Sequence, residues 1–181
     1  MKKRNLKILT FLSIIGLLTV KSYGQLAHKI EMTDDNRLLG LGTQHIIKSD
    51  ILNEERPIII SLPHGYEETQ FNYPVLYVLD GLQNIKHTVG TVEHLTESGL
   101  IPSIIVVGIE SLDRTRYLTP SQAGQNIHGG VGNKSISQSG GAPIFLEFLK
   151  EELIPFVDDN YRTHPYRIIE GHSLGGLFGV Y

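Results

Sequence analysis

Cysteine and tryptophan are both absent from the 181 residues of this chain. Without cysteine the chain has no disulfides, no thiolate metal ligands and no cysteine nucleophile. The lack of cysteine is compatible with export but does not establish it. The remaining composition is ordinary, with 40% hydrophobic and 19% charged residues, and this balance predicts a globular protein of one domain.

Basic residues are scarce once the first 24 residues are set aside. Those 24 contain five of the 16 basic residues and no acidic ones, so the rest has 11 basic and 19 acidic residues, a formal net charge of −8. No basic cluster follows that would neutralise a phosphate backbone. Nucleic acid is therefore not expected as a partner.

The N-terminus has the pattern of a secretory signal peptide. Basic residues within the first seven positions precede an apolar run over residues 8–20, and the small residues Ser22 and Gly24 suit a cleavage site. A single-pass anchor is the alternative, but this run is shorter than the roughly 20 residues that cross a bilayer core. We expect cleavage after Gly24, export to the periplasm or the extracellular space, and no stable membrane anchor afterwards.

The rest of the chain reads as a lead-in, residues 25–42, followed by a domain over residues 43–181. Two β-branched runs separated by polar residues predict an antiparallel strand pair at the start of that domain. Three further strands are predicted, two of them from almost unbroken apolar runs that suit strands buried on both faces. The five predicted strand segments cover residues 43–51, 56–63, 74–81, 103–110 and 166–171.

Helical spacing separates the last three of these strands. One apolar stripe runs from Ile85 to Leu95, and a second, containing Ile144 and Phe148, lies in residues 142–161 and turns Glu151 and Glu152 outward. Pro155 is expected to kink or restart that second helix. Strand, helix, strand, helix, strand predicts an α/β fold, a mostly parallel sheet with helices on both faces.

The last predicted strand runs into Gly171-His172-Ser173-Leu174-Gly175, which matches the pattern GxSxG. In a nucleophile elbow this pattern turns a strand sharply into a helix and exposes the serine, and the N–H of Leu174 would lie where an oxyanion forms. By itself the pattern also fits a glycine-rich turn with an incidental serine. The strand before it and the helical stretch after it favour the elbow.

Five stretches, in order, resemble the “putative esterase” (esterase D-like) family of α/β-hydrolases. They are NEERPIIISLPHGY, YPVLYVLDG, DRTRYLTP, FLEFLKEELIPFVDDNYRT and YRIIEGHSLGGLFGVY, and the likeness runs from about residue 43 to the end. The family includes siderophore esterases, S-formylglutathione hydrolases, feruloyl and acetyl-xylan esterases, and mycolyltransferases. The last two stretches resemble the siderophore-esterase branch most closely.

The resemblance implies a secreted serine esterase that needs no cofactor and acts on a small-molecule ester, either of siderophore type or an acyl-sugar or phenolic ester. Ser173 would be the nucleophile, and Leu174 and Leu82 would supply the oxyanion-hole N–H groups. Asp80 and Gly81 would shape the turn before Leu82, and Asp80 is also a candidate substrate contact, although an ordinary strand-ending turn explains this pair as well. Acyl transfer to a sugar is a second possibility within the same chemistry.

The general base is not evident in the sequence. His172 adjoins the serine, but neighbouring residues on a tight elbow point apart, so it is a candidate substrate contact and not the base. In this fold the acid and the histidine follow the serine. The sequence is therefore expected to be an N-terminal fragment that is inactive alone, and the alternative function is a non-catalytic fragment or binding module.

The stretch between Glu110 and Pro143 is expected to be a long glycine-rich loop at the active-site edge of the sheet. Arg114 and Arg116 within it are candidate contacts for an anionic or phenolic substrate. A mobile connection whose arginines pair with local acids is the alternative. The other histidines show neither HExxH nor a tight cluster, so no metal site is predicted.

Overall fold

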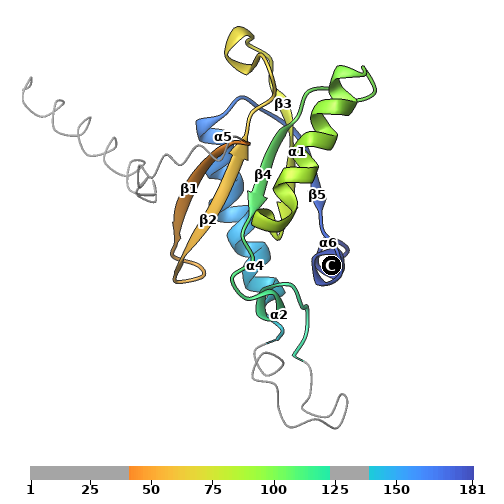
Figure 1. Ribbon diagram of the computed structural model, residues 1–181. Coiled ribbons are helices and arrows are strands. Elements are labelled where there is room, and N and C mark those ends of the chain that lie inside the picture. Colours follow the sequence, from red (N-terminus) through yellow and green to blue (C-terminus); the bar gives the residue numbers. More distant parts are fainter. Residues whose placement is uncertain (1–40, 123–138) are drawn as a thin grey trace, which may run out of the picture. The chain divides into compact units, whose positions relative to one another are not determined.

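The computed structural model describes residues 41–122 and 139–181 (Figure 1). The predicted signal peptide, most of the lead-in and the middle of the long loop lie outside these ranges. No helix in the described part of the chain is long and apolar enough to span a membrane.

A five-stranded mixed sheet forms the centre of the described domain, with the strand order β1-β2-β4-β3-β5. The first two strands form the predicted antiparallel hairpin, and β2 also runs antiparallel to β4, whereas β3 is parallel to both β4 and β5. The predicted parallel core is thus confirmed for three strands. The strand bounds are β1 Thr43–Ser49, β2 Glu54–Ser61, β3 Tyr73–Leu79, β4 Ile105–Ile109 and β5 Thr163–Glu170.

The two central strands are buried, as their unbroken apolar sequences predict. All five residues of β4 are buried, and only Pro74 in β3 is not fully so. At the edge of the sheet β5 differs, because Tyr166 and Ile169 remain 62% and 40% exposed. The parallel strands that lead to the candidate site therefore include two core strands and one edge strand.

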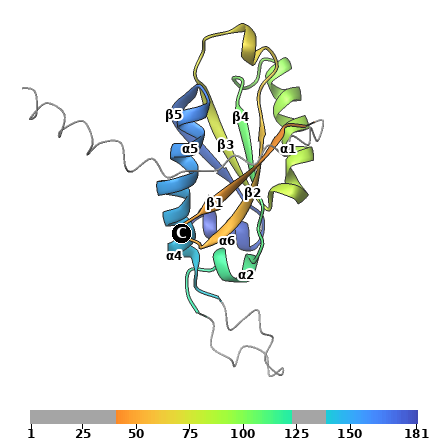
Figure 2. The same ribbon diagram turned by 90° about the vertical axis from the view of Figure 1, so that its left-hand side faces the viewer.

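Helices cover both faces of the sheet, as predicted (Figure 2). Helix α1, Gly81–Glu97, packs on one face through Ile85 and Val89. The opposite face carries α4, Ala142–Phe148, the π-helical turn η2, Leu149–Leu153, and α5, Ile154–Asn160. The short elements are η1, Tyr66–Glu68, α2, Arg114–Tyr117, and α6, Leu174–Gly179.

Pro155 explains the π-helical turn. A proline inside a helix lacks the N–H of the regular ladder, and its ring collides with the carbonyl group of the preceding turn. In this chain the backbone widens into η2 immediately before the proline, which then occupies the first turn of α5. The predicted restart of the helix is confirmed.

The predicted orientation of this helix is wrong at two positions. Ile144, expected to face inward, is 37% exposed, while its neighbour Phe145 is 1% exposed. Glu152, expected to face outward, is 6% exposed and accepts hydrogen bonds from the backbone N–H groups of Asp50 and Ile51 at 3.0 and 3.1 Å. It also accepts a hydrogen bond from Ser49 Oγ. Apolar spacing could not reveal that a buried glutamate closes the β1–β2 turn.

The predicted long loop contains a helix at its start. Asp113 caps α2, because its side chain accepts a hydrogen bond from the backbone N–H of Arg116 at 2.9 Å. Tyr117 and Leu118 are buried at the end of this turn, with exposures of 2% and 0%. The loop therefore leaves β4 as an ordered, anchored segment at least as far as Gln122.

Candidate active site

The predicted elbow is present between β5 and α6. Ser173 is the residue before α6, it is exposed, and its φ and ψ angles are 57° and −116°. A positive φ is rare for a residue with a side chain, and such conformations concentrate at functional sites. The turn is closed by a 2.9 Å hydrogen bond from the N–H of Gly175 to the carbonyl of His172.

Gly171 is required by the close approach of this turn to its own helix. A Cβ at this position would lie 2.4 Å from both the carbonyl carbon and the carbonyl oxygen of Gly175. Both are backbone atoms, which cannot rotate out of the way. The first glycine of GxSxG is thus explained by contact between two backbone segments.

A second tight turn lies at the carboxyl end of the neighbouring strand β3. Asp80 is left-handed, with a φ of 55°, and is 3% exposed. A Cβ on Gly81 would lie 2.6 Å from the carbonyl carbon of Gly108 in β4, so α1 starts in direct contact with the sheet. The parallel pairing of β5 with β3 brings this turn to the same edge of the sheet as Ser173.

Arg114 connects these two turns. Its Nε lies 2.7 Å from Asp80 Oδ1, and its Nη2 donates to the carbonyl oxygen of His172 at 3.3 Å. Of the two interpretations of the loop arginines, pairing with a local acid is therefore what the structure contains for Arg114. Arg116 is exposed, and its guanidinium carbon lies 4.9 Å from the ring centroid of Tyr117.

The two predicted oxyanion donors occupy different environments. The N–H of Leu174 is the first in α6 and has no partner within that helix. The N–H of Leu82 donates to Glu110 Oε2 at 3.1 Å, while the Leu82 side chain is 56% exposed. A carboxylate thus lies on the N–H group that the resemblance assigns to an oxyanion.

A buried arginine, Arg56, contacts the segment that follows β4. Arg56 is fully buried, and its Nη1 donates to the carbonyl oxygen of Glu110 at 2.7 Å. Burial lowers its pKa from the usual value for arginine, although the neighbouring Glu54 opposes that effect. Glu54 also accepts a hydrogen bond from Tyr117 at 3.0 Å, and burial, followed by this bond, raises the pKa of Tyr117.

No described histidine serves as a base beside the serine. The side chain of His172 is exposed, and its contribution to the elbow is its carbonyl oxygen. Within residues 41–122 and 139–181, no histidine ring hydrogen-bonds to Ser173 Oγ, and no three potential ligands form a metal site. The described part of the chain therefore contains the predicted nucleophile and the predicted N–H donors, and no histidine ring bonded to the serine.

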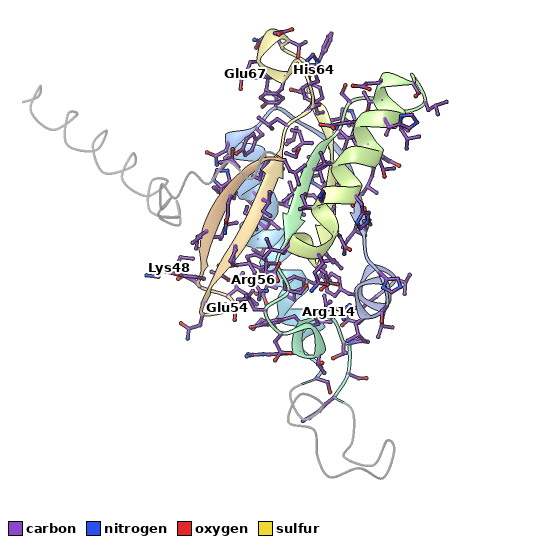
Figure 3. All side chains as sticks on the ribbon, in the orientation of Figure 1. Lys48, Glu54, Arg56, His64, Glu67 and Arg114 are labelled. Atoms are coloured by element: carbon purple, nitrogen blue, oxygen red, sulfur yellow. The ribbon has the colours of Figure 1, made fainter. Side chains whose placement is uncertain are left out.

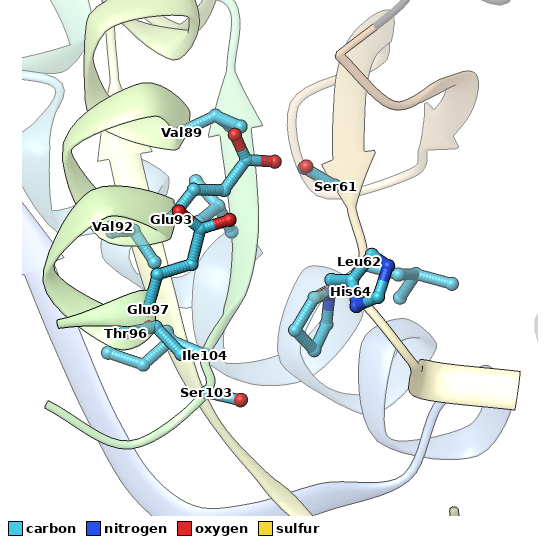
Figure 4. A pocket seen from close by; sticks show the side chains of 12 residues that line it. Ser61, Leu62, His64, Val89, Val92, Glu93, Thr96, Glu97, Ser103 and Ile104 are labelled. Atoms are coloured by element: carbon cyan, nitrogen blue, oxygen red, sulfur yellow. The ribbon is translucent and has the colours of Figure 1, made fainter. Parts of the chain in front are cut away.

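A cavity of about 380 Å³ lies at the other end of the sheet (Figure 4). Its walls include Ser61, His64 and Glu93, and it adjoins Ile104, just before β4 begins. Figure 3 places His64 and Arg114 at opposite ends of the sheet. This cavity is therefore separate from the candidate active site.

Sequence reasoning missed Glu110 and Ser111 as parts of the site. Ser111 Oγ accepts a hydrogen bond from the N–H of Asp80 at 3.3 Å, and Glu110 reaches Leu82. Their position offered a signal, because Glu110 ends a predicted buried parallel strand and Ser111 follows it, and such strand ends share the ligand-binding edge of the sheet. Arg56 was missed for another reason, since the Glu110 carbonyl oxygen that it contacts lies 54 positions away in sequence.

Known proteins resemble this chain in sequence and in fold. The sequence profile of the family described as “Putative esterase” matches residues 49–181. The ferri-bacillibactin esterase BesA of Bacillus subtilis (strain 168) is 31% identical over 121 residues, which are 59% of this chain and 40% of that protein.

Two crystal structures are similar in fold. An IroE-like serine hydrolase from Shewanella oneidensis has a TM-score of 0.70 and 34% identity, over 76% of this chain and 44% of that chain. The BES protein from Bacillus cereus has a TM-score of 0.65 and 27% identity, over 76% of this chain and 56% of that one. The fold is thus of the α/β-hydrolase type, and the chain spans about half the length of these relatives.

Proposed function

This chain belongs to the family described as “Putative esterase”, and from that premise we propose that the protein hydrolyses carboxylic esters through an acyl-enzyme on Ser173. The observation that carries the proposal is the backbone of Ser173, with a φ of 57° at the start of α6 and an exposed side chain. This geometry presents the hydroxyl to a substrate at the carboxyl edge of the sheet.

In the proposed reaction, Ser173 Oγ bonds to the ester carbonyl carbon as its proton passes to a general base. The negative charge on the carbonyl oxygen is stabilised by the N–H groups of Leu174 and, once Glu110 has moved aside, Leu82. Collapse of this intermediate breaks the bond to the alcohol, which leaves with the proton. Water then attacks the acyl-serine, and the acid is released as Ser173 regains its proton.

The base in this proposal is a histidine outside the described residues. A serine hydroxyl needs such a partner within hydrogen-bonding reach, about 2.6–3.2 Å, because it is a weak nucleophile at neutral pH. His172 is not the base in this proposal, because neighbouring residues on a tight elbow point apart and its ring is exposed. Asp80 does not supply it either, since it is paired with Arg114.

A siderophore-type ester is the proposed substrate class. One relative bears the name ferri-bacillibactin esterase and shares 31% identity with this chain over 121 residues. An acyl-sugar or phenolic ester is the second candidate, and acyl transfer to an alcohol would use the same acyl-serine. Adding an alcohol to the reaction distinguishes hydrolysis from transfer by the product that forms.

Substitution of Ser173 by Ala tests the proposal directly. We expect the protein expressed at full length to hydrolyse p-nitrophenyl acetate, and Ser173→Ala to lower kcat/KM by roughly 10³-fold or more, because no acyl-enzyme can form. Ser98→Ala, at the exposed end of α1, is the control and should leave kcat/KM unchanged. Equal turnover by the wild type and Ser173→Ala would contradict the proposal.

A non-catalytic binding module is the alternative from a different class. It would keep the elbow but hydrolyse no ester, and a fluorophosphonate probe would not label its serine. Rapid stoichiometric labelling that is lost in Ser173→Ala would exclude this alternative, because the probe reacts only with an activated hydroxyl.

We also propose that the protein is exported, on the basis of the N-terminal pattern in residues 1–24. N-terminal sequencing of the protein recovered from the periplasm or medium should begin at Gln25. Recovery of only the uncleaved chain, in the cytoplasm, would contradict export.

A further inference from the structure

An ion pair between a buried carboxylate and a partly exposed guanidinium, Asp80 and Arg114, lies between the two turns of the candidate active site. Asp80 follows β3, Arg114 begins α2 beyond β4, and His172 belongs to the elbow after β5. One guanidinium reaches both turns, with Nε 2.7 Å from Asp80 Oδ1 and Nη2 3.3 Å from the His172 carbonyl oxygen. Three consecutive parallel strands of the sheet are thus joined at their carboxyl ends by one side chain.

Asp80 is held firmly enough to orient the arginine. Its side chain is 3% exposed, and its N–H donates to Ser111 Oγ at 3.3 Å. Its carbonyl oxygen accepts hydrogen bonds from the N–H groups of Gln83 and Asn84 at 3.0 and 3.1 Å, which fixes it to the first turn of α1. A buried carboxylate needs a charged partner, because desolvation without one is costly. Arg114 is that partner.

The two turns carry the two proposed oxyanion donors. Leu82 lies two residues after Asp80, and Leu174 lies two residues after His172. An oxyanion hole requires both N–H groups to converge on one atom at about 2.7–3.1 Å. The donors belong to different helices, α1 and α6, so their separation depends on what holds those helices together at this end. Among the described residues, Arg114 is the side chain that hydrogen-bonds to both turns.

We propose that Asp80 and Arg114 are positioning residues that set the separation of the Leu82 and Leu174 N–H groups. The inference rests on the proposed esterase function. Asp80 orients the guanidinium, and the guanidinium holds the His172 carbonyl, so that the elbow keeps its place relative to α1. Both hydrogen bonds of Arg114 are made to groups of the protein itself. Its contribution to catalysis is therefore indirect, through the position of the elbow backbone.

Kinetics of three variants test this role. We expect Asp80→Asn and Arg114→Ala each to lower kcat for p-nitrophenyl acetate by about 100-fold, because a misplacement of about 1 Å costs that much, with KM changed less than about twofold. The double variant should be no slower than Arg114→Ala, because the two residues act as one unit. A large rise in KM at unchanged kcat would overturn the proposal, since it would place Arg114 on the substrate, and so would additive losses.

Chemical rescue provides a second test, and its first arm uses Arg114→Ala alone, so it does not depend on whether Asp80→Asn folds. Added guanidinium ion at a non-denaturing concentration should restore much of the kcat of Arg114→Ala and none of the kcat of the double variant, because Asp80 holds the added ion. Equal rescue of both variants would overturn the proposal.

Amide exchange at Gly175 reports on the elbow without any reaction. This N–H donates to the His172 carbonyl at 2.9 Å, so its exchange should accelerate in Arg114→Ala and slow again with guanidinium. Unchanged exchange at Gly175 in Arg114→Ala would overturn the positioning role of Arg114, even if the protein were inactive. A wild type that hydrolyses no ester, but whose exchange responds as expected, would contradict only the esterase function.

The matched control is the exposed ion pair Arg167–Asp158, with Nη2 and Oδ2 2.6 Å apart and side chains that are 34% and 32% exposed. Arg167→Ala removes an arginine of similar exposure whose side chain bonds to Asp158 and the Pro165 carbonyl oxygen and to neither turn. It should change neither kcat nor Gly175 exchange, because exposed ion pairs contribute little. A loss of kcat equal to that of Arg114→Ala would show a general effect of losing an ion pair and would overturn the specific role.

Discussion

The turns after β3 and β5 have similar backbone conformations, but different groups restrain them. Each contains a non-glycine residue with a positive φ, 55° at Asp80 and 57° at Ser173, and each contains a glycine where a Cβ would strike backbone atoms. Asp80 is buried and bonded through its side chain and both backbone groups, whereas Ser173 is exposed.

This difference shows how Ser173, the proposed nucleophile, can have a strained backbone and still keep a free side chain. Positive-φ residues cost on the order of 1–3 kcal/mol and persist when their surroundings over-determine them. At Asp80 the residue's own side chain contributes to that restraint. At Ser173 the restraint comes from neighbouring backbone, chiefly the contact of Gly171 with Gly175 and the bonds to the His172 carbonyl. Ser173 should therefore tolerate substitution structurally, while its neighbours should not.

The largest effect is expected from Gly171→Ala, which breaks the restraint at the elbow. Its methyl group would lie 2.4 Å from backbone atoms of Gly175, so α6 must move. We expect destabilisation by about 1–3 kcal/mol, as in other overpacked sites, and a fall in kcat/KM of about 100-fold or more. Urea unfolding and ester hydrolysis measure the two effects.

Gly179→Ala is the control for that substitution, because its Cβ would meet Ile169 Cγ2 at an ordinary 3.7 Å. It should leave kcat/KM within about twofold of the wild type. If Gly171→Ala behaves like this control, the elbow is not held by the backbone contact and the comparison between the two turns fails.

A smaller effect is expected from Glu110→Ala, which frees the N–H beside the β3 turn. Glu110 Oε2 lies 3.1 Å from the N–H of Leu82, where a substrate oxyanion would have to replace it. We expect kcat/KM for a neutral ester to rise by about two- to tenfold, a modest gain because the bond is exposed to solvent. The control Glu147→Ala, at an exposed position of α4, should change nothing. A fall in kcat/KM would instead make Glu110 a supporting group of the site.

The smallest effect is expected at Asn53, the other described non-glycine residue with a positive φ, 53°. It lies in the β1–β2 turn, is exposed and is far in sequence from the site. Glycine adopts this conformation without steric cost, so Asn53→Gly should raise the free energy of unfolding by about 0.5 kcal/mol. A higher urea midpoint with unchanged kcat/KM would show strain without function, and a lower midpoint would contradict this view of the positive φ.

The sequence predicted most of the fold because local patterns decided it. Unbroken apolar runs identified β3 and β4, and the glycine spacing around Ser173 identified the elbow before any contact was known. Pro155 predicted the break that the structure resolves as η2 and α5. In each case a property of neighbouring residues, such as burial on both faces or a missing N–H, fixes the element.

The failures concern contacts between distant residues. Glu152 was expected at the surface because a charged residue in an amphipathic helix usually faces water, yet its partners lie more than 100 positions earlier, in the β1–β2 turn. The pairing of Arg114 with Asp80 spans 34 positions and joins segments that meet only in the folded sheet. Hydrophobic periodicity does not reveal such pairs, so the elbow around Ser173 was predictable from the sequence and the groups that hold its surroundings were not.

The buried Glu152 also has a consequence for the order of events during synthesis. The N–H groups of Asp50 and Ile51, at the tip of the first hairpin, bond to a carboxylate 102 and 101 positions later in the chain. At about 5–20 residues per second, a ribosome takes roughly 5–20 s to supply that acceptor. Until then these two N–H groups can bond only to water. The β1–β2 hairpin is therefore synthesised first but completes its hydrogen bonding late.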